Sequence, residues 1–278
     1  MFTLDYRKSF NKQTYRVYLM GDLHIGRIGV AEKKIQTAID IINEDRNGYV
    51  CLMGDLVESI TPSDKRYKPA EQSGKHARIT SQCDDVIDMF KPIAHKVLSI
   101  LIGNHEWKVE ETLNTAEYIR DGLGLDIKTG SWTNKVILSD SIKLWLTHGH
   151  GSINHKAGDP EQRERNEAIA IKRKLRDLSA DCIIMAMGHV HKLRICKPSK
   201  RLWIVDGKQT YPETIIDPAT GGISEDMRYY CSTGSFVTGY VEGVDTYVER
   251  AQYAPTELGM IKCSIQQDKV KDVEKIIL

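Results

Sequence analysis

The stretch Tyr49-Val50-Cys51-Leu52-Met53-Gly54-Asp55-Leu56-Val57-Glu58 indicates how this chain folds. It begins as a short apolar run, which is typical of a fully buried strand, and breaks at a glycine that is followed by two carboxylates. In an open α/β sheet, functional groups lie just beyond the carboxyl ends of the strands. We therefore expect Asp55 to belong to a functional site at the edge of a sheet.

The same pattern recurs along the chain. Further apolar runs occur at 17–20, 97–102, 143–146 and 182–187, and each leads into Asp, Asn or His, usually beside a glycine. The residues that follow these runs are Gly21-Asp22-Leu23-His24, Gly103-Asn104-His105-Glu106, Thr147-His148-Gly149-His150 and Gly188-His189-Val190-His191. Together with the first stretch, these strand ends predict one metal site that is assembled at a shared sheet edge.

Composition limits the classes of protein to which the chain can belong. Its 278 residues can bury a substantial core, and its 41% hydrophobic and 28% charged content is ordinary for a soluble globular protein. The net charge of +1 gives no global attraction to nucleic acid or membrane, so any attraction to an anionic substrate must be local. No stretch approaches the roughly 18 apolar residues that span a bilayer.

The cysteines and the N-terminus predict a cytoplasmic protein that does not contact a membrane. The first residues lack the long apolar core of a signal peptide. The six cysteines include no CxxC pair, and Cys51 and Cys182 lie inside apolar runs, which indicates buried thiols in a reducing compartment.

The order of elements predicts an α/β fold. A strand over 14–20, a helix over 31–44 and the strand around 49–53 form a βαβ unit, so we expect a parallel sheet. Further helices are expected over 76–91, 112–121, 161–178 and 268–276. Residues 134–147 predict two strands, and strand-like runs follow at 202–205, 228–231, 235–240, 245–249 and 259–264. We expect one domain over 1–278, with a metal-binding core over 14–191 and a β-rich part over 192–278 that completes a second sheet.

The side chains at the strand ends suit two metal ions. Asp, Asn and neutral His supply oxygen and nitrogen ligands to divalent ions such as Mn, Fe, Zn, Co and Ni, and the set includes no cysteine, which argues against structural zinc. The candidate ligands are Asp22, His24, Asp55, Asn104, His148, His189 and His191. This set is too large for one ion and divides between two if a carboxylate bridges them, for which Asp55 is the natural choice.

In order, these blocks resemble the signature of the calcineurin-like metallophosphoesterase superfamily. The matching residues are Gly21-Asp22-Leu23-His24, Gly54-Asp55-Leu56-Val57-Glu58, Gly103-Asn104-His105-Glu106, His148-Gly149-His150 and Gly188-His189-Val190-His191, and they span residues 21–191. The resemblance implies a four-layer α/β/β/α sandwich of two mixed sheets with a dinuclear metal centre. It implies one ion held by Asp22, His24 and His191, a second held by Asn104, His148 and His189, and Asp55 as the bridge.

The resemblance also implies catalytic roles. His105 matches the histidine that protonates the leaving group, and Glu58 falls where protein phosphatases of the family carry an aspartate that orients it. Ser59 stands where those phosphatases have an arginine, which argues against the protein Ser/Thr phosphatase branch. Between His148 and His150, the pattern favours His148 as the ligand because glycine follows it, and leaves His150 beside the ligands or the substrate.

The implied activity is hydrolysis of a phosphodiester, in nucleic acid or in a small molecule, by in-line attack of a hydroxide held between two divalent ions, with manganese the first expectation. A phosphomonoesterase and a catalytically silent binding scaffold on the same fold are the alternatives. Candidate substrate contacts are His150, Lys156, Lys192 and Arg194, the last two within a basic run over 192–201, although surface positions explain them equally well. Residues 192–278 are too short and too β-rich to supply both a capping domain and the partner-docking segment of double-strand-break nucleases.

Overall fold

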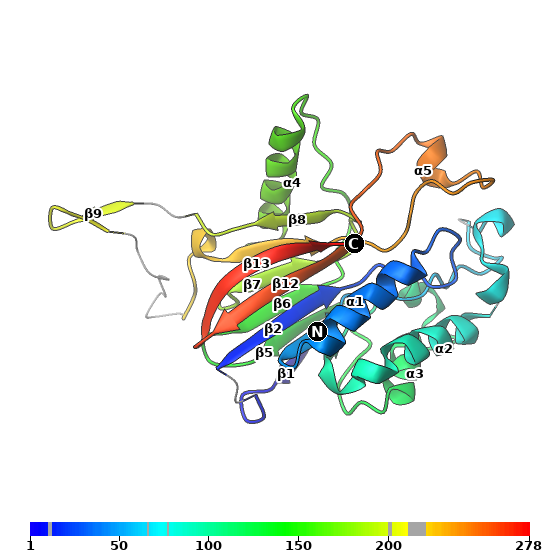
Figure 1. Ribbon diagram of the computed structural model, residues 1–278, viewed down its shortest axis with the longest axis horizontal. Helices are drawn as coiled ribbons and strands as arrows, with labels where there is room; N and C mark the ends of the chain where they lie inside the picture. Colours follow the sequence, from blue (N-terminus) through cyan, green and yellow to red (C-terminus); the bar gives the residue numbers. More distant parts are fainter. Residues whose placement is uncertain (11–12, 66, 77, 200–201, 211–220) are drawn as a thin grey trace.

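Two β-sheets lie face to face in the computed structural model, which describes residues 1–278 except 11–12, 66, 77, 200–201 and 211–220 (Figure 1). The first sheet has the strand order β13-β12-β2-β3-β4, in which β2, β3 and β4 are parallel and β12 and β13 antiparallel. Its strands are β2 (Thr14–Met20), β3 (Gly48–Leu52), β4 (Val97–Ile100), β12 (Gly259–Gln266) and β13 (Lys269–Ile277).

The second sheet is also mixed, with the strand order β1-β5-β6-β7-β11-β8. Its strands are β1 (Phe2–Asp5), β5 (Thr133–Ile137), β6 (Lys143–Thr147), β7 (Ile184–Met187), β8 (Leu193–Cys196) and β11 (Tyr229–Thr233). A separate hairpin, β9 (Trp203–Val205) and β10 (Lys208–Thr210), turns at Asp206-Gly207. Residues 192–278 thus add β8 and β11 to one sheet and β12 and β13 to the other.

Helices cover the outer faces of the two sheets, which gives four layers. Helices α1 (Glu32–Glu44), α2 (Ile79–Phe90) and α3 (Thr115–Gly122) enclose one apolar core against the first sheet, and α4 (Pro160–Leu175) encloses another against the second. A third core lies between the sheets. Side chains alternate along β2, so this strand contributes to two cores: Tyr18 and Met20 face the helices, whereas Val17 and Leu19 face the other sheet. The predicted four-layer sandwich of two mixed sheets is confirmed.

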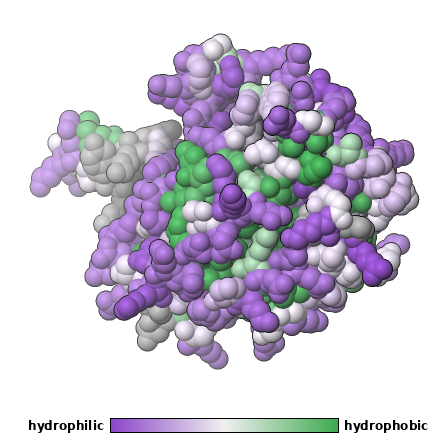
Figure 2. Space-filling model, turned by 45° about the vertical axis from the view of Figure 1, so that its right-hand side comes forward, coloured by the Kyte–Doolittle hydropathy of each residue, from purple (hydrophilic) through white to green (hydrophobic). Residues whose placement is uncertain are grey.

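The remaining helical segments are short. They are η1 (Pro69–Glu71), η2 (Gly74–His76), η3 (Lys91–Lys96), η4 (Glu106–Val109), η5 (Glu225–Met227) and α5 (Tyr247–Arg250). Within the described residues, no helix is long and apolar enough to cross a membrane. Hydrophilic residues cover most of the face in Figure 2, and hydrophobic residues gather near its centre.

The predicted helix over 268–276 is wrong, because Lys269–Ile277 forms β13. Gln267 and Asp268 both adopt left-handed backbone conformations, with φ of 50° and 53°, and so make the tight turn that joins β12 to β13. The register between these strands shifts between Ser264 and Ile265, at a bulge that lets Val270 and Val273 both face the core between the sheets. Apolar residues three apart therefore imitate a helical spacing.

The predicted strands over 235–240 and 245–249 are also wrong. Residues 235–240 form only isolated bridges, such as Val237 with Val30. Residues Tyr247–Arg250 form α5, because the hydroxyl of Thr246 accepts a hydrogen bond from the Glu249 amide at 3.2 Å and caps the helix. Threonine favours strands on average, but here its hydroxyl caps a helix, so the residues after Thr246 are helical.

A buried lysine closes the C-terminal end of α1. Lys96 is 6% exposed, and its Nζ donates hydrogen bonds to the carbonyl oxygens of Ile42, Asn43 and Asp45 at 2.7, 2.9 and 2.9 Å. These carbonyls belong to the last turn of the helix and the residue after it, where partners within the helix are lacking, and the positive charge complements the helix dipole. Lys96 thereby fixes the point at which α1 leads into β3.

We expect Lys96→Met to lower the free energy of unfolding by about 3 kcal/mol, because it leaves several buried carbonyls without a charged donor. Urea denaturation measures this change. The matched control is Lys91→Met in the same segment, whose side chain is exposed and whose loss should change stability by less than about 0.5 kcal/mol. Equal stability of the two variants would contradict the capping role of Lys96.

Candidate metal centre

All candidate ligands lie just beyond the carboxyl ends of strands, in both sheets. Asp22 and His24 follow β2, Asp55 follows β3, and Asn104 follows β4. From the second sheet, His148 follows β6, and His189 and His191 follow β7. Because the two sheets pack face to face, their edges bring these residues into one cluster.

The backbone around this cluster is conformationally unusual. Left-handed φ values between 47° and 68° occur at the candidate ligands Asp22, His24, Asp55, His189 and His191. For residues other than glycine such a conformation costs about 1 kcal/mol or more. Backbone bonds hold it in place, since the amide of Asp22 donates to Gly54 O at 2.9 Å and that of His24 to Asp55 O at 3.0 Å. Strain of this kind gathers at functional sites.

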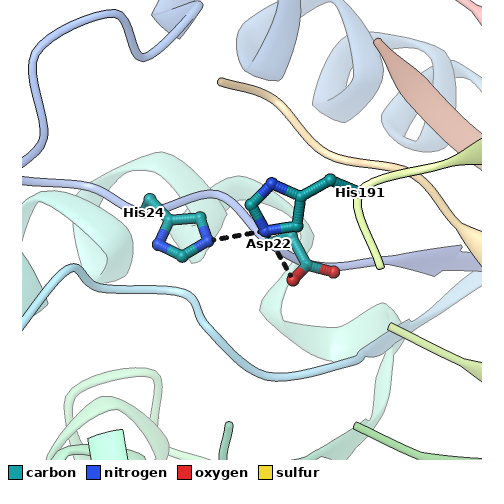
Figure 3. A group of neighbouring side chains, drawn as sticks. All are labelled: Asp22, His24 and His191. Carbon is teal, nitrogen blue, oxygen red and sulfur yellow. Dashed lines mark hydrogen bonds and ion pairs between the residues drawn. The ribbon is translucent and has the colours of Figure 1, made fainter. Parts of the chain in front are cut away.

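The first group of ligands consists of Asp22, His24 and His191 (Figure 3). Nε2 of His191 lies 3.1 Å from Nε2 of His24 and 3.3 Å from Oδ1 of Asp22. Asp22 and His24 are fully buried, whereas the side chain of His191 is 35% exposed. The group is therefore open to solvent on the side of His191.

The second group consists of Asn104, His148 and His189. Oδ1 of Asn104 lies 3.2 Å from Nε2 of His148 and 2.7 Å from Nδ1 of His189. His148 is fully buried, and the other two side chains are half-buried. The two groups are also linked directly, because the His189 amide donates to both carboxylate oxygens of Asp22, at 3.0 and 3.1 Å.

Asp55 lies between the two groups. Its Oδ2 is 3.8 Å from Nε2 of His24 and 3.3 Å from Nε2 of His148, so one oxygen faces a ligand of each group. Its Oδ1 accepts a hydrogen bond from the His105 amide at 3.0 Å. This is the position that a bridging carboxylate would occupy.

The histidine hydrogen bonds show that the cluster suits cations. Nδ1 of His24 is 2.8 Å from Oε2 of Glu58, and Nδ1 of His148 is 2.9 Å from Met53 O, so in each neutral ring the proton would be held on Nδ1. The Nε2 lone pairs then point inward, where they meet other acceptors, and a shared cation removes that repulsion. Ligand atoms about 2.1 Å from a common ion lie roughly 3.0–3.5 Å apart. Four of the observed separations, from 3.1 to 3.3 Å, lie in this range, whereas Asn104 to His189 is shorter at 2.7 Å and Asp55 to His24 longer at 3.8 Å. The oxygen and nitrogen donors of the cluster therefore fit two divalent ions.

Glu58 holds two histidines at once. Its carboxylate bonds to Nδ1 of His24, and its backbone oxygen accepts from Nδ1 of His105 at 2.7 Å, while the carboxylate is 3.5 Å from the same His105 nitrogen. Burial opposes protonation of His24, but the hydrogen bond to Glu58 and the nearby carboxylates raise its pKa. Burial likewise opposes ionisation of Glu58, and the bond to His24 nevertheless lowers the pKa of Glu58. Glu58 thus touches both a candidate ligand and the candidate proton donor.

Glu106 is a structural residue of the site to which sequence reasoning assigned no role. Its buried carboxylate accepts hydrogen bonds from the amides of Asp55, Leu56, Val57 and Gly103, at 2.5–3.3 Å. Burial and the charge of Asp55 raise the pKa of Glu106 to about 7. Glu106 therefore ties the loop after β3 to the loop after β4. The only available signal was its place directly after His105.

The candidate substrate contacts lie outside the ligand cluster. His150 and Lys156 are exposed on the loop between β6 and α4. Lys192 and Arg194 are both paired with the fully buried carboxylate of Glu167, and Nε of Arg194 lies 2.8 Å from it. Lys200 and Arg201, which end the predicted basic run, lie outside the described residues.

A glycine is required where the loops after β3 and β4 meet. A Cβ at Gly103 would lie 2.0 Å from Oδ1 of Asp55 and 2.6 Å from its amide nitrogen, so any side chain there must displace Asp55. Gly158, in contrast, has open space around its Cα.

We expect Gly103→Ala to reduce metal affinity about 10-fold or more, because it moves the central carboxylate, which positions ligands of both groups. Gly158→Ala is the matched control and should bind metal as the wild type does. Isothermal titration with Mn²⁺ on the metal-stripped proteins measures both. Unchanged affinity in Gly103→Ala would contradict the central position of Asp55.

The chain resembles several solved structures at low sequence identity. The solved structures similar to it include a metallophosphoesterase from Sphaerobacter thermophilus, with 14% identity, 95% of this chain and 88% of that chain covered, and a TM-score of 0.38. A purple acid phosphatase, PPD1, from yellow lupin shows 12% identity, coverage of 96% and 54%, and a TM-score of 0.46. The nuclease MPE of Pseudomonas putida shows 13% identity, coverage of 94% and 87%, and a TM-score of 0.33. No curated protein matches the sequence.

A sequence model of one family gives the assignment. The model described as calcineurin-like phosphoesterase matches residues 15–208, which is more than half of the chain. The matched range contains every candidate ligand from Asp22 to His191, together with Glu58 and His105. The chain belongs to the calcineurin-like phosphoesterases.

Proposed function

We propose that this protein is a dinuclear-metal-dependent phosphoesterase that hydrolyses phosphodiesters. The observation that carries the proposal is the position of Asp55, one oxygen of which faces His24 of one ligand group and His148 of the other. Two ions held in this way would bind phosphoryl oxygens, stabilise developing charge and lower the pKa of a bound water.

The residues divide between the ions as the two groups do. Asp22, His24 and His191 would hold one ion, Asn104, His148 and His189 the other, and Asp55 both. These oxygen and nitrogen ligands suit Mn²⁺, which we propose as the working ion, and also Fe, Zn, Co and Ni.

His105 is the proposed proton donor to the leaving group. Its side chain is 7% exposed, and its ring centroid lies 4.6 Å from that of the ligand His24, edge to face. The bond from Nδ1 to Glu58 O at 2.7 Å would fix the orientation of this ring beside the proposed ions. Glu58 would position this ring and His24 together.

Charge balance favours a diester over a monoester. A phosphomonoester carries between one and two negative charges at neutral pH, since its second pKa is about 6, whereas a diester carries one. Arg27, the arginine beside Glu58, is already paired with Glu71 at 3.2 Å and with Glu58 at 3.9 Å. We leave Lys192 and Arg194 out of the proposed substrate contacts because both are paired with Glu167, and Arg194 also with Glu257 at 2.9 Å. His150 and Lys156 remain exposed candidates.

The thiols support a reducing compartment. Cys51, Cys83, Cys182, Cys231 and Cys263 are free and buried, and burial raises the pKa of the Cys51 and Cys263 thiols, which keeps them protonated. We therefore propose a cytoplasmic location.

The proposal is tested with metal-stripped protein that is reloaded with Mn²⁺ and assayed on bis-p-nitrophenyl phosphate, on p-nitrophenyl phosphate and on single- and double-stranded DNA. We expect Asp55→Ala to lose both metal and diester turnover. His105→Ala should keep its metal but slow turnover by roughly 10²–10⁴-fold, the usual contribution of a general acid. His95→Ala, at an exposed position in η3, is the matched control and should behave as the wild type.

The outcomes separate the alternatives. Equal loss of metal in Asp55→Ala and His105→Ala would contradict the division of roles, and preference for the monoester would make the protein a phosphatase. Two bound ions without turnover on any substrate would favour the catalytically silent scaffold.

A further inference from the structure

An exposed tryptophan stands beside the metal centre and has no part in the proposed chemistry. Trp107 lies in η4 and is 56% exposed. The turn that carries it is closed by a hydrogen bond from the Trp107 amide to Gly103 O at 3.0 Å. Residues three apart on a helical turn lie on the same side, so the side of this turn that carries Asn104, a half-buried candidate ligand, also carries Trp107.

Aromatic rings connect Trp107 to the ligands. Its ring centroid lies 6.2 Å from that of Trp132 at an interplanar angle of 64°, and Trp132 lies 5.8 Å from the ring of His148 at 65°. Trp132 is half-buried, and its backbone oxygen accepts a hydrogen bond from the His148 amide at 2.9 Å. The exposed indole is therefore the outer end of a packed series of rings that begins at a metal ligand.

The neighbouring residue holds this segment to the loop after β3. Nζ of Lys108 lies 3.1 Å from Oδ2 of Asp64. The turn that carries Trp107 is thus closed by the hydrogen bond to Gly103 and tied to Asp64 by the ion pair of Lys108, while the indole packs on Trp132. A large aromatic side chain kept exposed on such a support offers a flat surface for a planar ligand, because bases stack on indole rings irrespective of their sequence.

We propose that Trp107 stacks on a nucleobase next to the scissile phosphate, so that the preferred substrates are nucleotide-containing phosphodiesters. This inference rests on the proposed function, because it names the substrate class of the same site. Trp107 would determine specificity and would contribute to substrate binding, whereas His105 would act on the leaving group.

Kinetics on substrates with and without bases test the inference. We expect Trp107→Ala to raise KM for a thymidine dinucleotide about 10-fold, within the range of measured base stacking, with kcat changed less than about threefold. An abasic dinucleotide with the same phosphodiester should show no such change in KM. Trp107→Phe should restore most of the affinity, and Trp145→Phe, which alters a tryptophan packed beneath α4, should have no effect. Equal losses on both substrates would overturn the inference.

A second readout does not require turnover. We expect thymidine 5′-monophosphate to quench tryptophan fluorescence of the Mn²⁺-loaded wild type and of Trp145→Phe, but not of Trp107→Phe, and deoxyribose 5-phosphate to leave it unchanged. If hydrolysis fails but this quenching is seen, the proposed function fails and the stacking site stands. Quenching that persists in Trp107→Phe would overturn the stacking site. Comparing KM for the dinucleotide, a 3′,5′-cyclic nucleotide and a single-stranded oligonucleotide then shows which kind of nucleotide-containing phosphodiester the site prefers.

Discussion

The buried carboxylate of Asp55 is the interaction on which the rest of the site depends. It is 1% exposed, it has a left-handed backbone, and it faces a histidine of each ligand group. Burial opposes its ionisation, but His148 and the other neighbouring histidines lower its pKa well below the usual value. A charge this deeply buried is stable only when it is paired or bound to metal. The surrounding residues are arranged to satisfy that requirement.

Much of the surrounding structure fixes Asp55 rather than reacting. Glu106 accepts hydrogen bonds from four backbone amides, three in the loop after β3 and one in the loop after β4. The absence of a side chain at Gly103 leaves room for the carboxylate of Asp55. The left-handed backbone conformations of the candidate ligands cost free energy, and backbone hydrogen bonds between neighbouring loops offset this cost. The two sheets supply the frame, because their packed faces bring carboxyl ends of strands from both sheets to one edge. The same frame explains why residues far apart in the chain, such as Asp22 and His189, bond directly.

The substrate side of the site differs from the metal side in its construction. The innermost ligands are buried and held by hydrogen bonds, whereas Asn104, His189 and His191 are half-buried and form the open side. Basic residues that the sequence placed beside the substrate are paired with acids in the structure, as Lys192 and Arg194 are with Glu167. Under the proposed function, recognition of the substrate would depend on the ions and on side chains such as Trp107 rather than on a track of free positive charge.

The sequence by itself determined the α/β class and the strand ends at which candidate ligands lie, because both follow from local patterns: apolar runs of strand length, and Asp, Asn or His after each, usually beside a glycine. The four layers were implied by the resemblance to a family. The sequence predicted β2 and α1 to within a residue from local patterns as well. It predicted β13 wrongly, because a bulge created by pairing with β12 places Val270 and Val273 on one face. Only the tertiary structure decided which oxygen of Asp55 faces both groups, that Glu106 joins two loops, and that Glu167 occupies Lys192 and Arg194. Those contacts join residues far apart in the chain, and their distances depend on how the two sheets pack.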